Sequence, residues 1–232
     1  MQRMLPAALL VTATFFLAPA PLAAAATPTV TVTGEGTVSE QPDLATLSVA
    51  LITNDDDAQA ATSKNNTTYA AIVGRLGSLG IAARMIRTSA FDITFVPKPD
   101  ASAQYKPPRT GYIVTRRLAI DIGNLTLVGR ALDAAVAAGA TEVDGVSFGL
   151  RDARAAHAKA LAAAMRDAAR QAAAVAEAAH LKLGAVQWIA AGRTSVAPAP
   201  LLRAAAANVP TQIAPSAVEV RAAVDVKYAL EP

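Results

Sequence analysis

The chain has 232 residues, no cysteine and a formal net charge of +3. Without cysteine the protein has no thiol nucleophile, disulfide or thiolate metal site, so packing must supply its stability. The charge imbalance is small and aromatic residues make up only 4% of the chain, which argues against a nucleic-acid-binding surface.

The N-terminal segment has the three parts of a secretory signal peptide. Arg3 precedes an apolar run over residues 5–17, and small residues then lead to Ala26. The apolar run is shorter than the roughly 20 residues that a membrane-spanning helix needs, and prolines follow it. We therefore predict a cleaved signal peptide over residues 1–26, and a mature protein over residues 27–232 that folds as one domain or as two small lobes sharing a sheet.

The first mature segment predicts two strands, Thr29–Val38 and Leu44–Ile52, or one long bent strand. We expect Gly34, Gly36 and Pro42 to form the bend, because glycine and proline interrupt regular strands. The G-x-G lacks the third glycine and the following helix of a dinucleotide-binding fingerprint, so that kind of site is excluded.

A first helix is predicted to begin after Asp55, Asp56 and Asp57, whose carboxylates suit a helix N-terminus, and to end before Gly80. The aspartates lack the glycine and the closing glutamate of a calcium-binding EF-hand loop, so helix capping is the better interpretation. Its apolar positions are Ala58, Ala61, Tyr69, Ile72, Val73 and Leu76.

Two strands are predicted near Met85–Phe95 and Gly111–Ile122. The proline-rich segment at about residues 97–110 should join them as a mobile hairpin loop. Even positions of the second strand share one face, and they are Tyr112, Val114, Arg116, Leu118, Ile120 and Ile122.

A second helix is predicted between a cap at Asn124 and a stop at Gly139. One side of it carries Leu127, Val128, Ala131, Leu132, Ala135 and Val136. A third and longer helix is predicted from Asp152 to about His180. Residues at steps of three and four form one apolar stripe along it: Leu161, Met165, Ala168, Ala172, Val175 and Ala179. Because most of this stripe is alanine, the helix should lie close against its neighbour.

The segment that follows the third helix predicts a strand containing Trp188. We expect its indole to pack in the core, with stacking on a sugar as the alternative. A second proline-rich loop is predicted at about residues 194–215. The last strand places Val218, Val220, Val224, Val226 and Tyr228 on one face and charged residues on the other, as in an antiparallel sheet with helices on one side.

Candidate chemistry is sparse. His157 and His180 sit near opposite ends of the third helix, roughly 35 Å apart, so they cannot share a metal ion within one subunit. No serine lies in a G-x-S-x-G nucleophile elbow. We therefore name no catalytic, cofactor-binding or metal-binding residue, expect no cofactor, and give a hydrolase with a dispersed site little weight.

Several blocks together resemble the SIMPL-domain family of periplasmic proteins. The matching residues occur in the family's order over nearly the whole mature chain: Gly34, Gly36, Pro42, Asp43, Ala45, Gly80, Ile81, Ile86, Thr88, Gly111, Tyr112, Gly139, Ala140, Gly145, Val146, Ser147, Phe148, Leu183 and Gly184. The chain departs from the family at His180, where a glycine usually supports a left-handed helix cap, so His180 must accept strain or the helix must end differently.

The resemblance implies an α+β fold with a mixed, mostly antiparallel sheet and three helices packed on one face. It also implies a non-enzymatic periplasmic protein linked to the cell envelope and to oxidative-stress tolerance, which assembles into homo-oligomers and could associate with the outer membrane. The alternative is a periplasmic binding module for an unidentified small ligand or an envelope polymer. Neither reading involves nucleic acid.

Overall fold

The computed structural model describes residues 27–99, 105, 107–192, 195–197 and 213–232. The predicted signal peptide over residues 1–26 lies outside the described residues, as do most of the second proline-rich loop and part of the first. The elements are β1 (Thr29–Glu40), β2 (Leu44–Asp55), α1 (Ala58–Ser78), η1 (Ala83–Met85), β3 (Ile86–Val96), β4 (Gly111–Ile122), η2 (Leu125–Leu127), α2 (Val128–Ala137), β5 (Glu142–Gly149), α3 (Arg154–Ala178), β6 (Lys182–Ala191), β7 (Ser195–Ala197) and β8 (Val218–Glu231). The short strand β7 corrects the prediction of a plain loop over residues 194–215.

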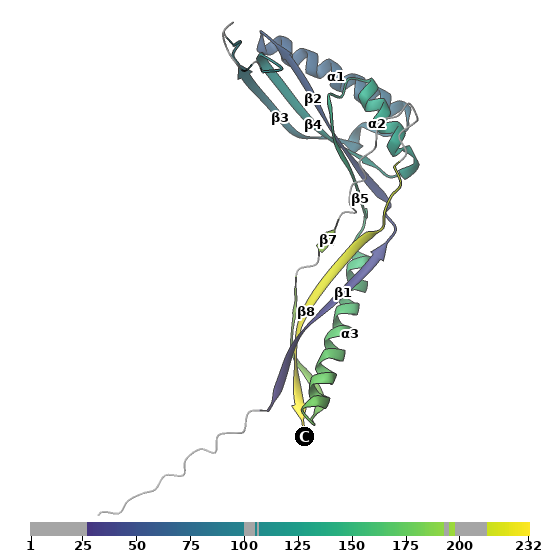
Figure 1. The fold of residues 1–232 in the computed structure, drawn as a ribbon. Coiled ribbons are helices and arrows are strands. Elements are labelled where there is room, and N and C mark those ends of the chain that lie inside the picture. Colours follow the sequence, from purple (N-terminus) through teal and green to yellow (C-terminus); the bar gives the residue numbers. More distant parts are fainter. Residues whose placement is uncertain (1–26, 100–104, 106, 193–194, 198–212) are drawn as a thin grey trace, which may run out of the picture.

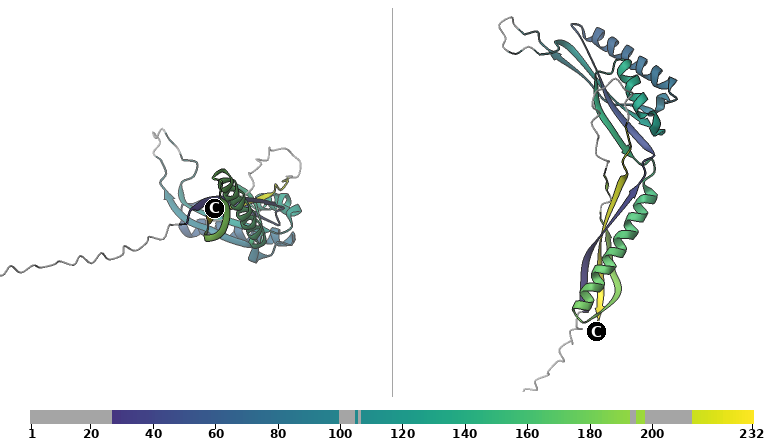
Figure 2. Two further views of the ribbon diagram at one scale, coloured as in Figure 1. Left: turned by 90° about the horizontal axis from the view of Figure 1, so that it is seen from below. Right: turned by 45° about the vertical axis from the view of Figure 1, so that its right-hand side comes forward.

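The described strands form two antiparallel sheets in an elongated molecule (Figures 1 and 2). In the first sheet, which we call the sheet of the α3 lobe, the strand order is β1-β8-β6 and β7 also pairs with β8. The second sheet belongs to the α1–α2 lobe and has the order β3-β4-β2-β5. The α+β class is confirmed, whereas the expectation of a single or shared sheet is wrong, because the described strands divide between two sheets.

The chain passes from one sheet to the other at Pro42 and Asp43, between β1 and β2. Asp43 fixes this junction: its backbone N–H donates to the carbonyl oxygen of Gly149, 3.2 Å away, and its carboxylate accepts from the backbone N–H of Arg151 at 2.6 Å. The predicted bend at Pro42 is therefore confirmed, and it separates two lobes.

The predicted bend at Gly34 and Gly36 is wrong. β1 runs unbroken through both glycines and pairs with β8 without a register shift from Thr29 to Glu40. Both glycines instead face α3. A Cβ on Gly34 would overlap the Ala164 carbonyl oxygen, and a Cβ on Gly36 would overlap that of Ala160. Glycine is required here because the helix backbone lies directly on the strand.

The buried stripe of α3 consists entirely of alanine: Ala156, Ala160, Ala164, Ala168, Ala172 and Ala176. The predicted stripe is right for Ala168 and Ala172. It is wrong for Val175 and Ala179, which are exposed, while Leu161 and Met165 are only partly buried. The buried alanines recur every four residues, which is slightly more than one helical turn, so the line of contact with the sheet rotates gradually around the helix. We attribute this rotation to the twist of the sheet, which changes the direction of the strands beneath the helix.

The α1–α2 lobe contains the larger core. Its buried side chains include Leu47, Leu51, Ile72, Leu76, Leu118 and Ile120. Asp57 caps α1 as predicted, since its carboxylate accepts from the backbone N–H of Ala60 at 2.8 Å. The even positions of β4 share the helix-covered face as predicted. In α2 the prediction fails at Val136, which is exposed because the buried side of this short helix is Val128, Gly129, Ala131 and Ala135.

Candidate functional site

The described residues offer little catalytic or metal chemistry. No group of three or more histidine, aspartate or glutamate side chains in this part of the chain is placed to hold a metal ion. None of the described helices is both long and apolar enough to cross a membrane. His157 lies in the first turn of α3 and His180 follows the end of that helix. The outer strands β3 and β6 instead carry large apolar side chains that are exposed.

The first candidate surface is β6, an outer strand of the sheet in the α3 lobe. Val186 pairs with Tyr228 and Ile189 pairs with Val226, so both lie on the face that α3 covers. Trp188 pairs with Lys227 and lies on the opposite face. All three side chains are exposed, Trp188 by 52% and Ile189 by 49%. The prediction that Trp188 packs in the core is wrong, because Trp188 shares the face of Lys227, opposite the face that α3 covers, and its side chain is exposed there.

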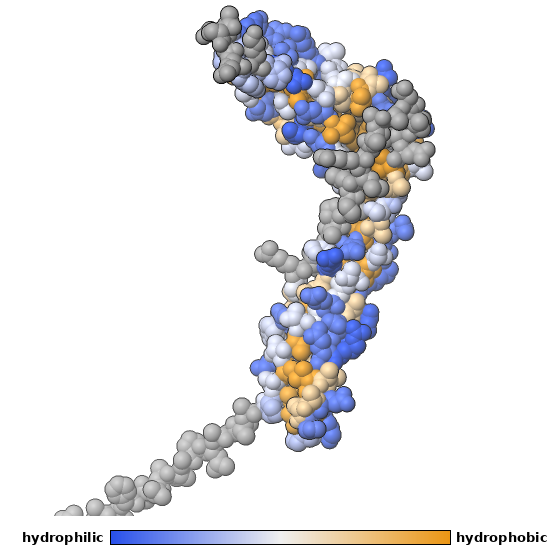
Figure 3. All heavy atoms as spheres, in the orientation of Figure 1, coloured by the Kyte–Doolittle hydropathy of each residue, from blue (hydrophilic) through white to orange (hydrophobic). Residues whose placement is uncertain are grey.

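We call Val186, Trp188 and Ile189 the β6 patch. An outer strand with apolar side chains on both faces exposes a row of unpaired backbone groups between two apolar surfaces. Figure 3 shows apolar residues gathered on the α3 lobe near the C-terminus of the chain. Partly buried Leu161, Met165 and Leu183 pack against the neighbouring core and extend this apolar character toward α3.

The second candidate surface is β3, the outer strand of the other sheet. Phe91, Ile93 and Phe95 pair with Arg116, Val114 and Tyr112 of β4, so they lie on the face that α1 covers. α1 packs over β2 and β4, and β3 extends beyond it. The three apolar side chains are therefore half exposed, and that of Phe95 is exposed by 57%. The Phe95 ring contacts the Tyr112 ring, with 4.9 Å between their centroids.

Arg116 links β3 to α1. Its guanidinium lies 4.7 Å from the centroid of the Tyr69 ring and 5.0 Å from that of Phe91, a geometry in which a cation is attracted to aromatic faces. Its Nη2 donates to Oδ1 of Asn66 at 2.6 Å. The buried Nε has no acceptor among the described residues, and no carboxylate of the described chain pairs with Arg116. A partly buried cation without an anion is therefore held in place here.

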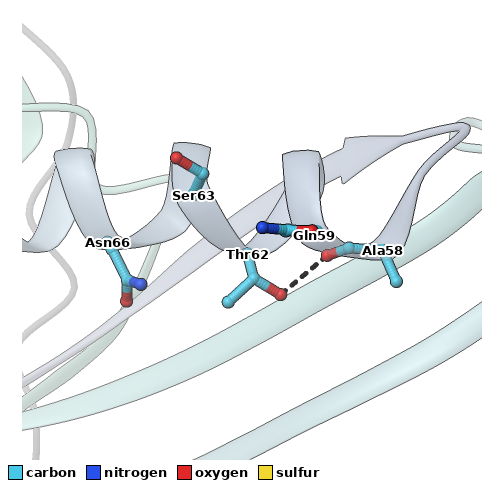
Figure 4. A pocket seen from close by; sticks show the side chains of 5 residues that line it. All are labelled: Ala58, Gln59, Thr62, Ser63 and Asn66. Carbon is cyan, nitrogen blue, oxygen red and sulfur yellow. Dashed lines mark hydrogen bonds between the residues drawn. The ribbon is translucent and has the colours of Figure 1, made fainter.

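A surface hollow of about 510 Å³ lies along the flank of α1 that ends at Asn66. Ala58, Gln59, Thr62, Ser63 and Asn66 line it, and Figure 4 shows Thr62 and Asn66 directed toward the strands beneath the helix. The hollow thus has hydroxyl and amide groups on its helical wall, and Asn66 connects it to Arg116 and Phe91.

Charges at the N-terminal end of α1 are already paired. Lys64 Nζ donates to Asp55 Oδ2 at 2.6 Å, and this hydrogen bond, with that from the backbone N–H of Asp57, lowers the pKa of Asp55 below its usual value. Lys98 pairs with Asp56 at 2.8 Å. Unlike these two lysines, Arg116 has no carboxylate partner among the described residues.

The sequence pattern predicted the strands that carry these surfaces but not the surfaces themselves. Alternation in Met85–Phe95 indicates a half-buried strand, and only the strand order shows that β3 is the outer strand. One feature of the sequence could have pointed to the β3 surface. Arg116 lies among the apolar residues of β4, and a charged residue on a core face needs a special environment.

Comparison with known proteins identifies the family. The model of the SIMPL family, described as "Protein of unknown function (DUF541)", matches residues 30–228. The chain is 29% identical over 211 residues to the "Uncharacterized protein YggE" of Escherichia coli strain K12, which covers 88% of this chain and 84% of that protein.

The chain is also 30% identical over 115 residues to the "26 kDa periplasmic immunogenic protein" of Brucella abortus strain S19. That match covers 49% of this chain and 46% of the Brucella protein, so it spans about half of each. Because the family model extends from the first strand to the last, the chain belongs to the SIMPL family.

Proposed function

We propose that this chain is a non-enzymatic periplasmic protein that self-associates through the β6 patch and supports the cell envelope, including its tolerance of oxidative stress. The observation that carries the self-association is the patch itself, an outer strand whose apolar side chains are exposed on both faces. The name of the Brucella relative supports the compartment, and the predicted signal peptide agrees with it.

Strand pairing explains why a second copy suits this surface. A copy that docks on β6 would cover Val186 and Ile189 on one face and Trp188 on the other, and would satisfy the free backbone groups between them. Burial of half-exposed side chains of this size contributes roughly 1 kcal/mol each, at about 25 cal/mol per Å² of apolar surface.

Self-association can be tested by light scattering coupled to size-exclusion chromatography. Ile189→Lys should reduce the particle mass, because it places a charge in the proposed contact. Val136→Lys is the matched control, since Val136 is a similarly exposed valine on α2 in the other lobe. A wild-type protein that stays monomeric at high concentration would remove self-association from the proposal.

The role in stress tolerance needs a cellular test. A strain that lacks the protein should be more sensitive to peroxide, and the Val136→Lys chain should restore survival whereas the Ile189→Lys chain should not. Equal survival with both variants would show that any protection does not depend on the assembly.

A second candidate function is a binding module for a small ligand or an envelope polymer. The exposed indole of Trp188, beside Lys227, favours it, because aromatic faces next to polar groups can stack on sugar rings. A ligand that binds only the folded protein raises its melting temperature. A thermal-shift screen of envelope saccharides should then give a shift with the wild type that Trp188→Ala removes. The absence of any shift would eliminate this candidate.

A further inference from the structure

We infer that the free side of β3 binds an extended peptide of another polypeptide, which adds to the sheet as a strand beside β3 and places a carboxylate against Arg116. This inference concerns a different lobe and a different strand from the proposed self-association, so each can fail without the other.

The unpaired side of β3 supplies the first argument. β3 pairs with β4 from Ile86 to Val96 and is the outermost strand of its sheet, so its other side presents free backbone donors and acceptors among the described residues. Long, apolar outer strands promote aggregation unless something covers them. An added strand satisfies these groups by main-chain hydrogen bonds, which is a recurring mode of peptide recognition.

The apolar row gives the second argument. Phe91, Ile93 and Phe95 recur at every second residue on the side that faces α1. An added strand presents its own side chains with the same period of two, so apolar residues at alternate positions would lie beside this row. A saccharide would use the aromatic faces but not the free backbone groups of β3. The coincidence of both features on one strand therefore favours a peptide.

The charge of Arg116 gives the third argument and defines the chemistry of the peptide. Arg116 is opposite Phe91 in the sheet, and its guanidinium stacks over that ring and so extends toward β3. It has no carboxylate partner in the described chain, and its Nε is buried without an acceptor. A glutamate on the added strand, opposite Phe91, provides the missing anion. Gln59, Thr62 and Asn66 line the hollow on the helical side, where they can hydrogen-bond polar side chains of the peptide.

The binding test uses a fluorescent peptide of alternating valine and threonine with one central glutamate, measured by fluorescence anisotropy with the purified protein. Ile93→Lys should raise the Kd by more than about tenfold, because it removes a central apolar contact. Val143→Lys is the matched control. Val143 is exposed by 41% against 46% for Ile93, and it lies on β5 at the opposite side of the same sheet. Its Kd should stay within about twofold of the wild type.

Two peptide variants separate strand addition from simple apolar contact without changing the protein. Methylation of alternate backbone nitrogens should abolish binding, because it removes the main-chain donors. Replacement of the glutamate by glutamine should weaken binding about fivefold, as expected for a partly exposed ion pair. Arg116→Gln should make the protein indifferent to that replacement. If this variant folds poorly, the two peptides compared on the wild type still report the charge.

Four outcomes would overturn the inference. The Ile93→Lys and Val143→Lys variants could bind the peptide equally well, or the methylated peptide could bind as tightly as its parent. Alternatively, Ile93→Lys could reduce the mass of an oligomer while the peptide does not bind the wild type, which would make a second copy of the chain the occupant. A saccharide that binds at Phe91 and Phe95, with no binding of the peptide, would also contradict it.

Discussion

His180 follows the end of α3 with a backbone φ of 57°, in the left-handed region that favours glycine. The N–H of His180 donates to the carbonyl oxygen of Glu177 at 3.0 Å, and that of Leu181 donates to Ala176 at 2.9 Å. This pair of bonds is the Schellman motif. α1 and α2 end in the same way at Gly80 and Gly139. The predicted strain at His180 is therefore confirmed, and the helix keeps its cap at the cost of that strain.

His180→Gly should stabilise the protein by about 1 kcal/mol, because glycine adopts the left-handed conformation without a Cβ clash. Urea unfolding followed by circular dichroism measures this gain. His180→Ala is the control and should bring no comparable gain, since alanine meets the same steric cost. Equal stability of the glycine variant and the wild type would show that the imidazole makes a compensating interaction.

Asp167 has a pKa that its hydrogen bonds hold below the usual value. Its pKa is lowered from 3.8 to about 2, first by the hydrogen bond from Arg170, then by the backbone N–H of Glu35 and by Gln171. Because the folded state holds this proton less tightly than the unfolded state, the carboxylate stabilises the fold above about pH 4. That contribution is lost as the pH falls from 3.8 to about 2.

The test compares the wild type with Asp167→Asn in urea at several pH values. The stability difference between them should be constant near neutral pH and should shrink between pH 3.8 and about 2. A difference that does not change with pH would mean that the carboxylate contributes no charge-dependent stability.

At the scale of elements, the contact between β1 and α3 depends on small residues on both sides. Gly34 and Gly36 face Ala160, Ala164 and Ala168, and the helix backbone lies against the strand. Polar bonds along the flank hold the same register: the Glu35 N–H donates to Asp167 at 3.1 Å, and Gln171 Nε2 donates to the Thr33 carbonyl oxygen at 3.1 Å. On the α3 side, this lobe therefore gains close packing from alanine instead of from large side chains.

Gly36→Ala should destabilise the protein by more than about 3 kcal/mol, because the added methyl group overlaps backbone atoms of α3 that cannot rotate away. Gly74→Ala is the control. A Cβ at Gly74 meets nothing within 4 Å, and alanine is the better helix former, so the variant should be neutral or more stable by up to about 1 kcal/mol. Chemical denaturation measures both. A tolerated Gly36→Ala would show that α3 can move outward freely.

At the scale of the whole molecule, the lobes have separate cores. Leu76 belongs to the core under α1 and α2, whereas Val226 belongs to the core under α3. The connections between the lobes pass through the Asp43 junction and the segment before β8, where Ile213 packs on the α1–α2 core. Each lobe thus has its own hydrophobic stabilisation.

We expect unfolding in differential scanning calorimetry to depart from a two-state transition, because two cores joined at a narrow junction need not unfold together. Leu76→Ala should lower the transition of the α1–α2 lobe, with a loss of about 2–5 kcal/mol, and Val226→Ala should lower that of the α3 lobe. A single two-state transition that both variants shift equally would show that the junction couples the lobes fully.

The sequence predicted much of the fold and little of the candidate site. The period of two in the strands and the caps at Asp57, Gly80 and Gly139 are local properties, and the structure confirms the elements that they define. Of the buried stripe of α3, only Ala168 and Ala172 were predicted, because steps of three and of four residues are equally compatible with a helical period. The local pattern does not contain the direction in which a helix crosses its sheet.

What the sequence determined by itself is the helices, most of the strands, the family and the apolar faces of β4 and β8, since these depend on neighbouring residues and on the backbone period. The tertiary structure alone decided the division into two sheets, the exposure of Trp188 and of the β3 row, and the close contact at Gly34 and Gly36. These features depend on which strands lie outermost and which backbones meet. Pairing and packing between residues far apart in the chain set that order, and a local pattern does not encode it.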